Sequence, residues 1–183
     1  MRRLLTLRFG RRPVGGQAGF TLFELIVVVC IVAIMAGILF NRLQLYQEAA
    51  EKAAMQQTAA AIKSALQMRV ASYMINGRDN EIEHLRGENP VSWLQEKPAD
   101  YAGEFYADAY ARVRPGSWYF DLNRRELIYV VNLGANFKPG PDGRKWARYR
   151  VRIEYEAVPE PGAAPRKVLS AVTFVPVQPY VWF

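Results

Sequence analysis

Residues 20–40, FTLFELIVVVCIVAIMAGILF, form an apolar run with a single ionisable carboxylate, Glu24, near its start. As a helix the run would extend about 30 Å at ~1.5 Å per residue, which matches the hydrocarbon core of a bilayer. We therefore expect it to span a membrane. An ionised acid in such a helix costs roughly 2.5–3.5 kcal/mol at the bilayer centre and less toward an end. No Lys, Arg or His lies within the run, so the partner of Glu24 is interfacial water, another protein or a positive group created at the segment's own end.

Composition leaves room for one modest globular domain besides this helix, in a chain of 183 residues of which 51% are hydrophobic and 22% charged. The formal charge of +7 at first favours a nucleic-acid partner. However, five arginines precede Gly19 with no acidic residue among them: Arg2, Arg3, Arg8, Arg11 and Arg12. Such a cluster beside an apolar span holds that end in the cytoplasm. Without it the charge is only +2 (seven minus five), and we expect the chain after the span to be exported.

Three interpretations of the N-terminus compete. A secretory signal peptide would be cut after the apolar stretch, where Ala33 and Ala36 offer only a poor cleavage site. A plain signal anchor fits the length of the apolar run and the charge before it, but it does not explain why Glu24 is present. The third interpretation places the cut before the apolar run, between Gly19 and Phe20.

The third interpretation has a specific resemblance behind it. Residues 19–25, GFTLFEL, follow a short basic leader and open an unbroken apolar helix, and this pattern resembles the processing site of type IV pilins and type II secretion pseudopilins. The match consists of a small residue before the cut, Phe after it, Thr-Leu next, and an acid at the fifth position of the mature chain. It covers the leader and the first helix only.

The resemblance implies that a membrane-embedded prepilin peptidase and methyltransferase removes residues 1–19 and methylates the new amine of Phe20. It further implies assembly with other pilins or pseudopilins on an inner-membrane platform. In such filaments the amine is thought to be neutralised by the acid of an adjacent subunit, here Glu24. Physically, two charges that are each costly in a nonpolar bundle cost much less when paired.

The chain also departs from the family pattern. Many members carry a proline near the end of the apolar run, where this sequence has Leu39-Phe40-Asn41-Arg42, so the helix geometry near Asn41 is left open. A single cysteine, Cys30, also excludes an intramolecular disulfide, including the one that closes the C-terminal loop of many major pilins. Both departures favour a minor subunit.

Beyond the membrane the helix is expected to continue. Residues 46–75 are rich in Ala, Gln, Glu, Lys and Met and contain neither Gly nor Pro. One stripe at helical spacing is predicted to cover a sheet: Met55, Ala59, Ile62, Leu66, Val70 and Tyr73. Asn76-Gly77 is predicted to end the helix.

The C-terminal half carries strand signals. SWYFDL (117–122) and ELIYVVNL (126–133) flank a short hairpin turn, residues 149–155 alternate apolar and charged side chains, and KVLSAVTFVPV (167–177) follows a Pro-rich loop. We predict an α+β, pilin-like fold in which the long helix packs on an antiparallel meander of about four strands. The expected organisation is a leader at 1–19, the membrane part of the helix at 20–40, its amphipathic continuation at 41–76, and a globular domain at 77–183.

No catalytic, cofactor or metal site is expected. His84 is the only histidine, and a solvated or capping role is predicted for it. Glu104 and Asp108 could share a helix face, but such pairs are usually solvated, and Asp142 lacks companion acids for a calcium site. Arg148, Arg150 and Arg152 are predicted to line one strand face, in solvent or against acidic neighbours or DNA. The terminal Tyr180-Val181-Trp182-Phe183 is predicted to pack against the sheet, and the alternative is an exposed tip used for assembly or adhesion.

Two hypotheses remain. The first is a minor pilin or pseudopilin in a bacterial inner membrane, with its N-terminus cytoplasmic and its domain periplasmic, which enters a type IV pilus or a type II secretion filament. The second is a monomeric inner-membrane-anchored periplasmic domain that binds a ligand or acts as an enzyme. Gly19 with Glu24 separates them, because an anchor needs neither residue.

Overall fold

The computed structural model describes residues 19–159 and 165–183 and shows an α+β chain. The predicted leader, residues 1–19, lies outside the described residues except for Gly19. Contacts divide the chain into two units, one ending at Leu43 and one running from Gln44 to Phe183.

Helix α1 spans Leu22–Ile75 and belongs to both units. It begins two residues later than predicted because Thr21 is the N-cap, whose Oγ1 accepts a hydrogen bond from the Glu24 amide at 3.2 Å. α1 continues through position 41, which the missing proline permits.

The end of α1 confirms the prediction. Gly77 has a left-handed φ of 66°, its amide bonds to the Met74 carbonyl, and the Arg78 amide bonds to the Tyr73 carbonyl. These two bonds are the pattern of a Schellman cap, which needs a residue that tolerates positive φ.

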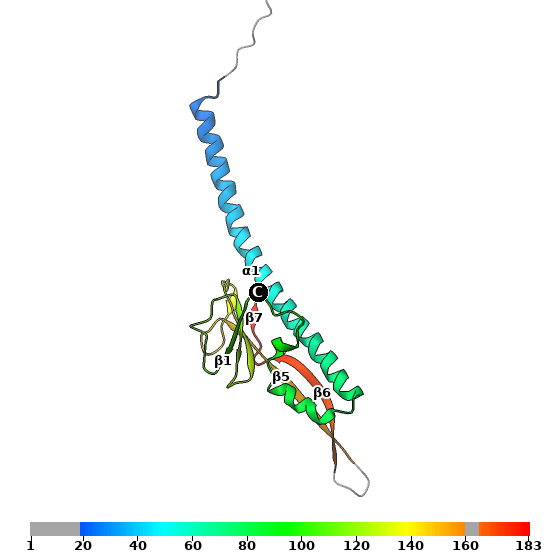
Figure 1. Ribbon diagram of the computed structural model, residues 1–183. Helices are drawn as coiled ribbons and strands as arrows, with labels where there is room; N and C mark the ends of the chain where they lie inside the picture. The colour runs from blue at the N-terminus through cyan, green and yellow to red at the C-terminus, as the bar shows by residue number, and fades with distance from the viewer. Residues whose placement is uncertain (1–18, 160–164) are drawn as a thin grey trace, which may run out of the picture. The chain divides into compact units, whose positions relative to one another are not determined.

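In the described residues, two 3₁₀ helices and seven strands follow α1: η1 (Asp79–Arg86), η2 (Pro90–Trp93), β1 (Tyr101–Phe105), β2 (Ser117–Asp121), β3 (Glu126–Val130), β4 (Phe137–Lys138), β5 (Trp146–Val158), β6 (Arg166–Pro176) and β7 (Val181–Trp182). Five of the strands form one sheet in the order β1-β2-β3-β5-β6, and β4 pairs with β7. Within the second unit, α1 runs alongside β5 and β6 (Figure 1).

The predicted meander is correct for β2, β3, β5 and β6, which pair antiparallel in this order. The prediction of a purely antiparallel sheet of about four strands is wrong at its edge, because β1 adds a fifth strand parallel to β2. β1 is irregular: its register shifts between Tyr101 and Glu104, and Gly103 lies between them at φ 113°. The burial of its side chains alternates, but its five residues include Ala, Gly and Glu, which are depleted in strands, so the strand was not predicted.

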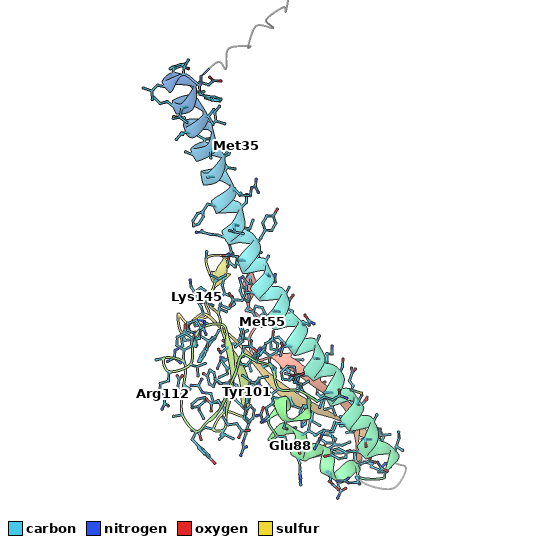
Figure 2. All side chains as sticks on the ribbon, turned by 45° about the horizontal axis from the view of Figure 1, so that its top comes forward. Met35, Met55, Glu88, Tyr101, Arg112 and Lys145 are labelled. Carbon is cyan, nitrogen blue, oxygen red and sulfur yellow. The ribbon has the colours of Figure 1, made fainter. Side chains whose placement is uncertain are left out.

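The core lies on both faces of the sheet. On one face the α1 stripe packs as predicted: Met55, Ile62 and Leu66 are at most 1% exposed and contact the cluster around Trp118 and Tyr129. Figure 2 places Met55 between α1 and the sheet. On the other face a smaller cluster gathers around Tyr119, Ile128, Val130 and Trp146, covered by Ala109 and Val113 of the loop that follows β1.

Candidate functional site

The N-terminal candidate residues lie at the very start of α1. Gly19 and Phe20 precede the helix, and the Phe20 side chain is 73% exposed. Glu24 lies in the first helical turn and is exposed. Within the described residues its carboxylate has neither a hydrogen-bond nor an ion-pair partner.

This turn has a second feature that was not predicted. Thr21 and Glu24 stand in the order T-x-x-E, the signature of a capping box, and Thr21 does cap the Glu24 amide. An acid in the first turn is also stabilised by the positive end of the helix dipole, typically by about 0.3–1 kcal/mol. Glu24 therefore suits a helix start as well as an ion pair with another chain.

The apolar part of α1 has no cover in the described chain. Every large apolar side chain from Leu22 to Phe40 is at least 39% exposed, and Cys30 is free and exposed as well. By length and composition, α1 is the helix of the described chain that could cross a membrane. A continuous apolar surface of this kind requires lipid or protein around it.

Two further carboxylates of α1, in the second unit, bind the globular part. Glu48 is 3% exposed and accepts hydrogen bonds from the amide and the side chain of Asn136, both at 2.8 Å, and from the indole of Trp182 at 2.9 Å. Burial alone raises the pKa of Glu48, but the hydrogen bonds from Asn136 and Trp182 outweigh it, so its pKa lies below the ordinary 4.5.

Glu51, one turn further along α1, accepts hydrogen bonds from the Tyr129 hydroxyl at 3.0 Å and from the Asn132 and Leu133 amides at 2.7 Å. Glu48 and Glu51 together form what we call the helix clamp. An acid pair three positions apart on an otherwise Ala-rich helix was the available signal, but its partners are over seventy residues away in sequence.

The C-terminus joins this clamp. Trp182 is 2% exposed and Phe183 is 51% exposed. The predicted packing is therefore correct for Trp182, whereas about half of the Phe183 side chain stays in solvent. Lys52 Nζ donates to the Trp182 carbonyl at 2.5 Å and lies 5.4 Å from the centre of the Phe183 ring. The last residues are thereby attached to α1.

The other candidate residues are not brought together. Glu104 lies in β1 and accepts from Asn89 at 2.7 Å, whereas Asp108 follows that strand and pairs with Arg144. Their predicted common helix face is therefore wrong, because the segment is extended. Burial raises the pKa of Asp108, but the bonds from Arg144 and the Tyr110 amide outweigh it and lower the pKa.

Asp142 accepts a hydrogen bond from the Arg144 amide at 3.2 Å within its own loop. The described residues contain no group of three or more His, Cys, Asp or Glu side chains arranged to hold a metal ion. His84 is exposed on η1, as predicted.

The three β5 arginines do share one face of the strand, because they alternate in sequence with Tyr149, Val151 and Ile153, which are buried on the opposite face. Arg148 and Arg150 lie 3.5 and 3.9 Å from the buried Glu126, and Arg152 lies 4.0 Å from Glu154. The pKa of Glu126 is raised by burial, which the nearby arginines only partly offset.

A scan against protein-family models, a search of curated proteins and a search of solved structures each found no match to the chain.

Proposed function

We propose that the chain is a structural subunit, of the minor pilin or pseudopilin type, of a type IV pilus or type II secretion filament. The observation that carries the proposal is Glu24, an unpartnered carboxylate in the first turn of an exposed apolar helix, five residues after Gly19. Cleavage between Gly19 and Phe20 would create a cation at the end of the same helix. Helices that pack side by side in a filament would then pair one subunit's Phe20 amine with another's Glu24.

The remaining features support the same assignment. The apolar half of α1 suits insertion into the inner membrane before assembly, with the arginine-rich end in the cytoplasm and residues 77–183 in the periplasm. The partners would be a prepilin peptidase and methyltransferase, other pilins or pseudopilins, the inner-membrane assembly platform and lipid.

Processing is the first test. Mass spectrometry of the protein extracted from membranes is expected to find methylated Phe20 as the first residue. Gly19→Arg should retain the leader, because the bulky cation occupies the small-residue position before the cut. A chain that begins at Met1, or after Ala36, contradicts the proposal.

Assembly is the second test. Glu24→Ala and Glu24→Gln should be cleaved and inserted normally yet enter sheared filaments poorly, because a neighbour's amine loses its counter-charge in a nonpolar bundle. Removing one partner of a buried pair costs about 3–5 kcal/mol. The measurement is the fraction of the protein in pelleted filaments relative to the total in the membrane.

Glu24→Asp is the matched control, since it keeps the charge and should retain part of the incorporation. If wild type, Glu24→Ala and Glu24→Gln enter filaments equally, the assembly role of Glu24 is contradicted and only its role at the helix N-terminus remains. Labelling of filament ends belongs to the same experiment, because a subunit placed first at a tip has no neighbour above it and would tolerate the change.

A further inference from the structure

A basic groove opens where β5 extends past the first residues of β3. β3 pairs with β5 only between Trp146 and Tyr149, so β5 has no β3 neighbour beyond Tyr149. The end of η1 and the β2–β3 turn wall the space that results, which has a volume of about 660 Å³. The groove lies within the second unit of the chain.

Arginines dominate its lining. Five line the groove, against a single carboxylate, Glu83: Arg86, Arg124, Arg125, Arg150 and Arg152. All five side chains are exposed. The lining therefore carries a formal charge of +4 (five arginines minus one glutamate). The five arginines come from η1, the β2–β3 turn and β5, which are distant in sequence. The tertiary fold therefore brings this charge together.

Two of these arginines are held in place. Arg125 Nη1 donates to the Gly87 carbonyl at 3.0 Å, and Arg86 Nη2 donates to the Ile153 carbonyl on the open edge of β5 at 3.3 Å. Arg86 Nε also lies 3.2 Å from Glu83 Oε1, and Arg124 Nε lies 3.8 Å from Asp121 Oδ2. Each guanidinium has five N–H donors, so several donors remain for a ligand. The carboxylates nearest to Arg150 and Arg152 lie at 3.9 and 4.0 Å, too far for a hydrogen bond.

The basic surface extends beyond the groove. Arg124, Arg144 and Arg148 lie 5.8, 4.8 and 5.1 Å from the centre of the Trp146 ring. Besides Arg124 of the groove, these contacts hold two more guanidinium groups on the face of the sheet opposite α1, and Figure 2 shows Arg112 on that side as well. A surface of this extent fits a long anionic polymer better than a single small anion.

The groove offers charge and little else. Among the described residues no Phe, Tyr or Trp lines it; His84 supplies the one ring, and the side chains of Val151 and Ile153 are at most 6% exposed. Successive bases of a single strand would find only this one imidazole to stack on, and a peptide would find no apolar pocket for an anchor residue. A flat lipid surface cannot follow a concave lining. Guanidinium groups, by contrast, bind phosphate oxygens through paired hydrogen bonds.

We propose that this groove binds the phosphate backbone of duplex nucleic acid, without reading its sequence. The inference is independent of the filament assignment and adds a ligand to the globular domain. The test is fluorescence anisotropy of a labelled 25-bp DNA duplex titrated with the full chain in detergent. With four or five phosphate contacts, affinity should fall on the order of 100-fold between 50 and 200 mM salt.

Arg150→Glu with Arg152→Glu should weaken binding at 50 mM salt by at least about tenfold, whereas Arg150→Lys with Arg152→Lys should retain most of it. Arg114→Glu with Lys138→Glu is the matched control: both side chains are exposed, lie outside the groove, and their reversal changes the net charge equally. This control should lose less than about threefold. Circular dichroism verifies folding, and Arg150→Gln with Arg152→Gln supplies a milder change at the same contacts.

An equal loss in the groove and control variants, or no loss in either groove variant, overturns the proposal. Polyglutamate or phosphatidylglycerol vesicles are titrated at the same charge concentration. If either binds the wild type more tightly than the duplex does, and depends on the same arginines, the groove is a site for an acidic peptide or a lipid surface and not for nucleic acid.

Discussion

The carboxylates of α1 show how surroundings decide the role of a residue. Glu48 and Glu51 are each satisfied by three donors from the globular part, whereas Glu24 has no partner for its carboxylate within the described residues. The clamp acids therefore hold the second unit together. Glu24 is left available for water or for another chain, which is the premise of the assembly proposal.

Replacement of Glu48 should reveal the strength of the clamp. Glu48→Gln turns an amide toward donors of Asn136 and Trp182, so one buried donor loses its acceptor, and we expect a loss of about 1–3 kcal/mol in the free energy of unfolding at pH 7. Because the pKa of Glu48 is lower in the folded chain than its ordinary 4.5, its ionised form stabilises the fold above about pH 4.5. That contribution is lost as the pH falls through the folded pKa.

The measurement is urea unfolding of wild type and variant between pH 7 and pH 3. The stability difference between them should be constant above about pH 5 and shrink below it. Glu156→Gln, on an exposed position of β5, should cost less than about 0.5 kcal/mol at every pH. A Glu48→Gln difference that stays constant down to pH 3 would contradict the clamp's pH dependence.

At the scale of elements, α1 changes its surroundings along its length. Its first part exposes apolar side chains all round, and its second part buries one stripe against the sheet. The stripe succeeds because residues three and four apart share a helix face. The same periodicity leaves Met68 outside, 69% exposed.

Alanine substitutions at a buried and at an exposed position of α1 should therefore have different effects on stability. Leu66→Ala removes a side chain that is 0% exposed and leaves a cavity, so we expect a loss of about 2–5 kcal/mol in the free energy of unfolding. Met68→Ala, two residues further along, should change it by less than about 0.5 kcal/mol. Urea unfolding of the detergent-solubilised chain measures both, and equal effects would show that the stripe is not the packed face.

At the scale of the whole molecule, the second unit contains a complete core of its own. The helix stripe, both faces of the sheet, the clamp and the β4–β7 pair all lie between Gln44 and Phe183. The described residues of the first unit form an apolar helix whose side chains are exposed.

A fragment of residues 44–183 should accordingly be a soluble monomer without detergent and unfold cooperatively, with mixed helix and sheet signals in circular dichroism. A fragment of residues 77–183 is the control: it lacks Met55, Ile62 and Leu66, exposes the Trp118 face of the sheet, and should aggregate or remain unfolded. A soluble but unfolded 44–183 fragment would contradict the independence of the second unit.

Features that depend on spacing within one helix, strand or turn could be predicted from the sequence. The apolar run, the helix stripe, the glycine cap at Gly77, the β2–β3 hairpin and the alternating face of β5 all follow from spacing along the chain, because helix and strand periods are local properties. The candidate residues Gly19, Phe20 and Glu24 also come from the sequence alone, and their proposed partners belong to other chains.

Only the tertiary structure decided the rest. The parallel β1, the β4–β7 pair, the helix clamp and the arginine groove each join segments distant in sequence. Such contacts depend on which strands meet and where each one stops, and no local period encodes that choice. Glu48 cannot be told from other helix acids until the fold brings Asn136 and Trp182 to it. Arg86, Arg125 and Arg150 form one site only because β5 extends past the first residues of β3.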